Sequence, residues 1–276
     1  MTSKQPGRLG NPDETLVSDP RTDPRIANAM AMLGELAPGV DAIDTDANYE
    51  QALKYCAAFE DAAALSHPME WQTMPDFPTV SSTEAVITGV DGNDITLFIH
   101  QPAQRDGALP CLVHTHGGGN LSIATTLKAK QEGWGELIDG VYAFCPYISG
   151  AYREQPADLP SLKENDGYLL SNSSMQVLVK VYDPELEHTN NPLAWPLQAS
   201  IEDLKGLPPH VVSMNELDPL RDEGIAFLRK LQAAGVSAVG KVVLGTGHAG
   251  DLSMPDIVPD IFQDSARALY SFAKSL

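Results

Sequence analysis

The pattern of hydrophobic positions changes near residue 80 of the 276-residue chain. Before this point, apolar residues recur at helical spacing over residues 24–36 and 48–65, after an extended Pro- and Asp-rich arm at 11–25. Proline residues then separate this region from a segment with short apolar runs. We therefore predict an N-terminal arm with helices over residues 1–80 and a distinct core over residues 81–276.

Short apolar strands and helices alternate in this core. A hairpin is predicted from residues 84–90 and 95–100, because Asp91-Gly92-Asn93-Asp94 between them is typical of a tight turn. Further strands are predicted at residues 109–114, 141–145, 210–214 and 239–244, and helices at 121–131, 168–181, 222–234 and 259–274. This alternation is typical of an α/β fold with a mainly parallel sheet flanked by helices.

The charge of the chain narrows the classes of function. With 18 Lys and Arg against 37 Asp and Glu, the formal net charge is -19, which disfavours nucleic acids and anionic membranes as partners. The polar N-terminus and the lack of a long apolar run predict a cytoplasmic protein. Three scattered cysteines are too few for a disulfide framework or a zinc finger, and Cys145 is interpreted as a small buried apolar residue.

Three predicted strand ends carry candidate chemistry, and the first is a glycine-rich turn. His116-Gly117-Gly118-Gly119 follows the predicted strand at 109–114. Consecutive glycines allow backbone N–H groups to point at a developing oxyanion, and this motif after a strand is a known oxyanion-hole pattern. Gly117 and Gly118 are the candidate oxyanion-hole residues. A simple tight turn is the alternative interpretation.

The other two strand ends carry an aspartate and a histidine. Asp218 follows the predicted strand at 210–214, and His248 lies on a small-residue loop after the predicted strand at 239–244. An aspartate can orient an imidazole, and a loop histidine titrates near neutral pH. Aspartate followed by histidine after the last two strands is the end of the Ser, Asp, His order of α/β-hydrolases.

Together these motifs resemble the hormone-sensitive-lipase-like branch of the α/β-hydrolase esterases, and the flanking sequence is similar to members of the brefeldin A esterase type. The resemblance covers nearly the whole chain. It implies a carboxylic-ester hydrolase that acts on a small-molecule ester or lactone without a cofactor or metal, with an N-terminal helical cap over the acyl pocket. It also implies that Asp218 and His248 are the acid and base of the catalytic triad. The resemblance does not define an oligomeric state.

One motif of this family is missing. The family carries a Gly-x-Ser-x-Gly nucleophile elbow between its oxyanion loop and its triad aspartate, and this sequence contains none. The first residues of the segment Gly117–Ala124 resemble the family's oxyanion loop, and its last residues resemble the helix that follows the nucleophile elbow in the family. We interpret this as an internal deletion near residues 116–121 that removed central strands and the nucleophile, so only weak residual catalysis is expected.

Three functional hypotheses follow from the missing serine. In the first hypothesis, Ser122 or Thr115 replaces the missing nucleophile and the chain is an esterase. In the second hypothesis, the chain is not catalytic and only binds a ligand or partner. In the third, His114 and His116 point to the same side of a strand and, with His248 or Asp218, hold the metal of a metal-dependent hydrolase.

Overall fold

The computed structural model describes residues 5–34, 43–72, 77–89, 91–104, 111–113 and 118–276. The chain divides into two compact units. We call Glu60–Leu112 the hairpin unit, and Met1–Phe59 with Val113–Leu276 the core unit. The helix α3 (Tyr49–Gln72) begins in the core unit and ends in the hairpin unit.

The core unit contains a parallel sheet whose strand order is β3-β4-β5. Its strands are β3 (Val141–Phe144), β4 (His210–Asn215) and β5 (Ala238–Val243). The other described elements of this unit are α1 (Gly7–Gly10), α2 (Pro24–Gly34), α4 (Gly118–Glu132), η1 (Gly135–Leu137), α5 (Ser161–Glu164), α6 (Asn172–Tyr182), η2 (Pro196–Gln198), α7 (Ile201–Leu204), α8 (Arg221–Ala233), α9 (Gly250–Ser253) and α10 (Pro259–Ser275).

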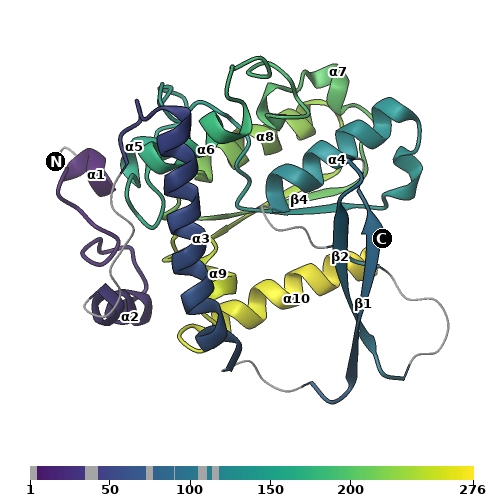
Figure 1. The fold of residues 1–276 in the computed structure, drawn as a ribbon, viewed down its shortest axis with the longest axis horizontal. Helices are drawn as coiled ribbons and strands as arrows, with labels where there is room; N and C mark the ends of the chain where they lie inside the picture. Colours follow the sequence, from purple (N-terminus) through teal and green to yellow (C-terminus); the bar gives the residue numbers. More distant parts are fainter. Residues whose placement is uncertain (1–4, 35–42, 73–76, 90, 105–110, 114–117) are drawn as a thin grey trace. The chain divides into compact units, whose positions relative to one another are not determined.

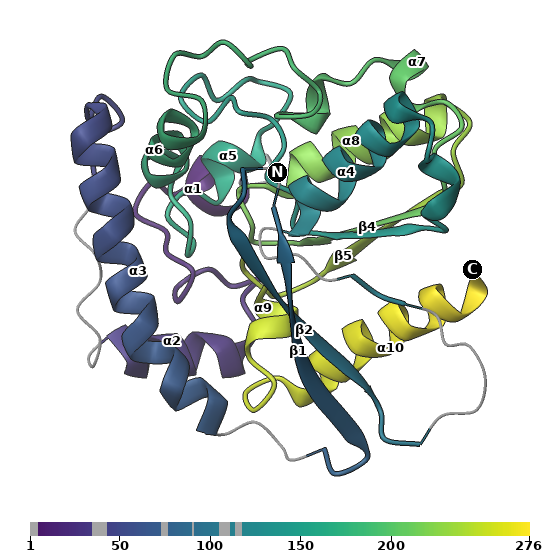
Figure 2. The ribbon, with the colours of Figure 1, turned by 45° about the vertical axis from the view of Figure 1, so that its right-hand side comes forward.

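Helices cover both faces of this sheet. Figures 1 and 2 show α4 and α8 on one face and α10 on the other. The α4–α8 side forms the main hydrophobic core, with fully buried side chains from both helices and from β4. These include Ile123, Leu127, Val212, Phe227 and Leu231. Burial of these side chains supplies the main driving force for assembling the layers and aligns the strand ends that carry Asp218 and His248.

A glycine at the start of α4 permits a very close approach to β3. A Cβ atom on Gly119 would lie 2.5 Å from Cα of Pro146 and 2.6 Å from the carbonyl oxygen of Phe144. Only glycine therefore fits without a shift of the backbone. This packing requirement accounts for the third glycine of the Gly117–Gly119 run independently of any role in catalysis.

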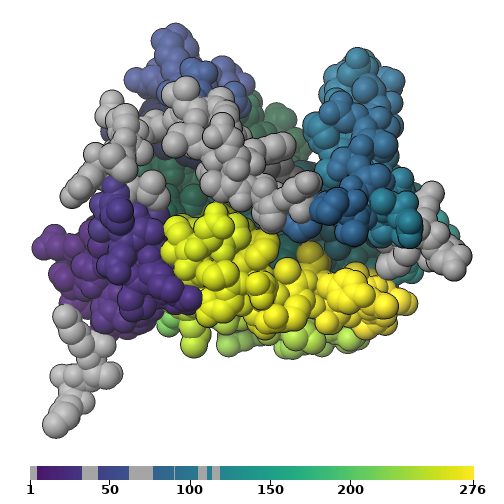
Figure 3. Space-filling model, turned by 90° about the horizontal axis from the view of Figure 1, so that it is seen from below, coloured from purple at the N-terminus to yellow at the C-terminus, as the bar shows by residue number. Residues whose placement is uncertain are grey.

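The N-terminal arm is anchored to the C-terminal part of the core unit. Figure 3 shows the purple segment that follows residue 4 lying beside the yellow C-terminal segment. The N–H of Asp23 donates to the carbonyl of Gly245 (2.9 Å), and Arg25 Nη1 lies 2.6 Å from Asp260 Oδ1. The arm is thereby bonded directly to the loop that carries His248.

The hairpin unit contains two antiparallel strands, β1 (Val80–Thr88) and β2 (Asp94–Pro102). Their register pairs Val80 with Pro102 and Thr88 with Asp94. Gly92 has a φ of 75°, the left-handed region that the tight connection requires. The hairpin predicted from this connection is confirmed, with both strands longer than expected.

The predicted α/β class with a parallel sheet is also confirmed. The strand predicted at residues 109–114 is wrong for its described part, because residues 111–113 form no strand. A strand needs a hydrogen-bonded partner, and among the described residues β3 pairs only with β4. The predicted boundary between a cap over residues 1–80 and a core over 81–276 stays a prediction. None of the helices in the described ranges is long and apolar enough to cross a bilayer.

Candidate active site

Asp218 and His248 meet at the carboxyl end of the parallel sheet. Asp218 follows β4 and His248 follows β5, and these strands are hydrogen-bonded neighbours. His248 Nδ1 lies 2.9 Å from Asp218 Oδ2, while the N–H of Leu220 donates to Asp218 Oδ1 (2.9 Å). The aspartate side chain is 1% exposed and that of the histidine 30%. The buried carboxylate fixes one ring nitrogen and leaves the imidazole partly open to solvent, which is the geometry of an oriented general base.

Carboxylates dominate the electrostatics of His248. Burial lowers the pKa of the imidazole, but the charge and hydrogen bond of Asp218 outweigh it. The charge of Asp251 acts in the same direction, so the pKa of His248 lies above its ordinary value of 6.5. These carboxylates stabilise the protonated imidazole, so His248 is a stronger base than an isolated histidine.

Asn215, the last residue of β4, connects three strand ends beneath the dyad. Its amide donates to Thr246 Oγ1 (2.6 Å) and Asp251 Oδ1 (3.0 Å). Its Oδ1 accepts the N–H of Ala249 (3.1 Å) and the thiol of Cys145 (2.8 Å). Residues on both sides of His248 are thus hydrogen-bonded to the one buried side chain of Asn215. These bonds fix the backbone of the His248 loop.

A cluster of charged side chains also holds the segment that carries Asp218. Both Glu164 oxygens accept from Arg221, at 3.0 Å each, and Glu164 also pairs with Arg21 of the N-terminal arm. Burial raises the pKa of Glu164, but the two arginines outweigh it and lower the pKa below its ordinary value. The side-chain amide of Asn165 donates to the carbonyl of Asp218 (3.1 Å). The arm and α5 together clamp the loop after β4.

The other predicted site residues lie at the start of α4 or outside the described residues, and their roles stay predictions. His114, His116, Thr115 and Gly117 lie outside the described residues. Gly118 is the first residue of α4. Ser122 lies within the first turns of the same helix, where its hydroxyl donates to the carbonyl of Gly119 (3.3 Å).

Cys145 is the residue of the site that the sequence interpretation missed. It follows β3 in a left-handed conformation with φ of 41° and is buried. Its sulfur lies within 4.8 Å of ligand atoms of both Asp218 and His248. The only signal in the sequence was its place at a predicted strand end, which a buried apolar residue explains equally well.

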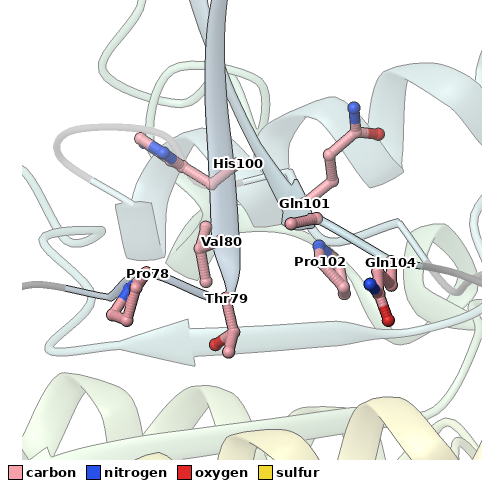
Figure 4. Close-up of a pocket in the computed structure, with 8 residues that line it drawn as sticks. Pro78, Thr79, Val80, His100, Gln101, Pro102 and Gln104 are labelled. Carbon is pink, nitrogen blue, oxygen red and sulfur yellow. The ribbon is translucent and has the colours of Figure 1, made fainter.

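The hairpin unit contains a separate pocket of about 670 Å³ at the open end of its two strands. Figure 4 shows His100 and Gln101 among its lining side chains, together with residues that flank the strands. His100 Nδ1 lies 2.8 Å from Ser82 Oγ. None of the lining residues belongs to the Asp218–His248 cluster, so the candidate chemistry lies at the dyad.

We expect Asp218→Asn to lower the pKa of His248 below its wild-type value. The carboxylate charge is the main opponent of the desolvation that favours neutral imidazole. Titration of the histidine ring protons by NMR, with His248 assigned from a His248→Gln variant, measures this change. Asp183→Asn, which alters a buried aspartate bonded to the N–H of His188, is the control and should leave His248 unchanged. An unaltered titration in Asp218→Asn would contradict the proposed coupling.

Comparison with known proteins identifies the class to which this fold and dyad belong. Residues 26–251 match the family model described as the alpha/beta hydrolase fold. Since the match spans most of the chain, the chain belongs to the α/β-hydrolase family.

Several of its relatives are named esterases. The chain is 32% identical to brefeldin A esterase, a bacterial homologue of human hormone-sensitive lipase, with a TM-score of 0.85 over 98% of each chain. It is 37% identical to an arylesterase of Saccharolobus solfataricus over 48% of this chain and 41% of that protein. With carboxylesterase NlhH of Mycobacterium tuberculosis the identity is 28%, over 78% of this chain and 65% of the relative. The chain therefore spans less than two thirds of the length of these curated relatives.

Proposed function

We propose that this chain is a carboxylic-ester hydrolase by descent that retains the base and orienting acid of a serine esterase but lacks the nucleophile. The observation that carries this proposal is the 2.9 Å bond between His248 and the buried Asp218 at neighbouring strand ends. In an intact triad, the histidine takes the proton of a serine that attacks the ester carbonyl. The missing Gly-x-Ser-x-Gly motif removes that attacking group from this sequence.

Acid–base groups without a nucleophile support only weak catalysis. His248 can still deprotonate a water molecule, and backbone N–H groups near Gly117 and Gly118 are the proposed oxyanion donors. Loss of one triad member leaves residual catalysis that comes from oxyanion binding and substrate positioning. The proposed substrate class is a small-molecule ester or lactone, by analogy with the esterase relatives.

Ser122 is the alternative nucleophile. Its hydroxyl donates to the carbonyl of Gly119 within the first turns of α4 (3.3 Å), whereas the family's nucleophile stands on the turn before a helix. We therefore propose that Ser122 does not form an acyl intermediate.

Fluorophosphonate labelling of the folded protein, followed by peptide mass mapping, tests this function. We expect no stoichiometric label, together with slow p-nitrophenyl acetate hydrolysis that falls further in His248→Ala. Ser122→Ala is the matched control and should leave that rate unchanged. A stoichiometric label on Ser122 or Thr115 that disappears in His248→Ala would overturn the proposal and establish a rebuilt serine or threonine mechanism.

A further inference from the structure

Three potential metal ligands come together at the end of the sheet. Cys145, Asp218 and His248 follow β3, β4 and β5 respectively, and each offers a ligand atom within 4.8 Å of the other two. Cysteine sulfur, imidazole nitrogen and carboxylate oxygen are the three donor types that zinc uses in proteins. We propose that these three residues bind a divalent transition-metal ion of the zinc class.

The three ligand atoms would have to move only a short distance to bind a small ion. Bonds of about 2.0–2.3 Å to zinc place tetrahedral ligand atoms roughly 3–4 Å apart. His248 Nδ1 and Asp218 Oδ2 are already 2.9 Å apart, so the sulfur of Cys145 needs the largest movement. The ion would take the place of the proton that these two atoms share, so the metal-bound form would lack the Asp218-oriented base of the proposed function, which belongs to the metal-free form.

Charge also favours a divalent cation at this position. A thiolate and a carboxylate balance the two positive charges of the ion, so the buried complex carries no net charge. The carboxylate of Asp251 adds to the negative field on both Cys145 and His248. Metal binding releases the thiol proton to solvent, and the remaining imidazole proton moves to Nε2.

Neighbouring groups hold the proposed ligands in place. The N–H of Leu220 donates to the second oxygen of Asp218. Such outer hydrogen bonds orient ligands in metal sites. Burial and the charges of Asp218 and Asp251 raise the pKa of the Cys145 thiol well above its ordinary value, so the charge of the ion itself has to stabilise the thiolate there. A water molecule would complete the tetrahedral ligand set of the ion. Three protein ligands and one open position are the arrangement of catalytic zinc sites.

This site differs from the one predicted from the sequence, which relied on His114 and His116. It uses Cys145 in their place, and its occupancy does not depend on ester hydrolysis. A failure of metal binding is therefore distinguishable from a failure of the proposed function.

Cobalt titration of the purified full chain, kept reduced, tests the proposal. We expect one Co²⁺ per chain, with a sulfur-to-cobalt charge-transfer band and the visible bands of a tetrahedral ion, and displacement by Zn²⁺. Cys145→Ala and His248→Gln should abolish the charge-transfer band or weaken binding by roughly a hundredfold or more, which exceeds most losses on removing an outer hydrogen-bond partner. Cys111→Ser, which alters an exposed cysteine, should have no effect.

Three results would overturn the proposal. The first is a folded wild-type protein without the charge-transfer band. The second is a band that survives Cys145→Ala, and the third is a band that is lost in His114→Gln and His116→Gln but not in His248→Gln. If Cys145→Ala fails to fold, alkylation of the wild-type protein with and without Zn²⁺ decides instead, carried out in urea just below the unfolding transition so that the reagent reaches the buried thiol. Zn²⁺ should then protect Cys145, identified by peptide mapping, and equal alkylation in both samples would contradict the site.

Discussion

Glu164→Ala is expected to lower the free energy of unfolding by about 1.5–3 kcal/mol, the range for losing hydrogen bonds to a charged group. Glu164 is buried and pairs with both Arg21 and Arg221. Its removal leaves the half-buried Arg221 guanidinium with only Asp222 as an ionic partner. Urea unfolding of the wild type and the variant at neutral pH measures the difference.

The exposed pair between Lys205 and Glu202 provides the control for this prediction. Its side chains are largely in solvent, so Glu202→Ala should cost no more than about 1 kcal/mol. The pKa of Glu164 is lowered in the folded state, so its contribution is present above the pKa of the unfolded chain and is lost as the pH falls. If the two variants lose the same free energy of unfolding at neutral pH, the ion pairs of Glu164 stabilise the fold no more than an exposed ion pair does.

A second large effect is expected from Glu223, a residue that is 1% exposed inside the core unit. Burial raises its pKa to about 8, although the N–H of Ile148 and the hydroxyl of Tyr152 donate to it and oppose the change. The folded state therefore binds this proton more tightly than the unfolded chain. Its contribution to stability is complete below the ordinary pKa of 4.5 and is lost as the pH rises through about 8.

Glu223→Gln should remove this pH dependence, because glutamine keeps the acceptor oxygen and has no proton to lose. Relative to the wild type, the variant should gain stability progressively between about pH 5 and pH 8. The gain approaches about 5 kcal/mol, since one pH unit corresponds to about 1.4 kcal/mol. Urea unfolding at a series of pH values measures it, with Glu202→Gln as an exposed control. Parallel curves for the wild type and Glu223→Gln would contradict a proton held by Glu223 in the folded state.

Local sequence rules determined much of the fold. The connection at residues 91–94 predicted the β1–β2 hairpin, and apolar spacing predicted α8, α10 and the three strands of the parallel sheet near their observed positions. These elements depend on neighbouring residues, through turn conformation and the burial of one face. The strand predicted at 109–114 failed in its described part because a strand also needs a partner, which no local pattern supplies.

The sequence by itself also determined the candidate pair Asp218 and His248, because each follows one of the last two strands and adjacent parallel strands bring such positions together. Only the tertiary structure decided which groups surround that pair. Cys145 and Glu223 look like a strand residue and a helix-start residue in the sequence, and Glu164 lies 143 positions from Arg21. Their bonds, burial and pKa values arise from chain segments that meet only after folding, so the chemistry of these side chains depends on the packing around them.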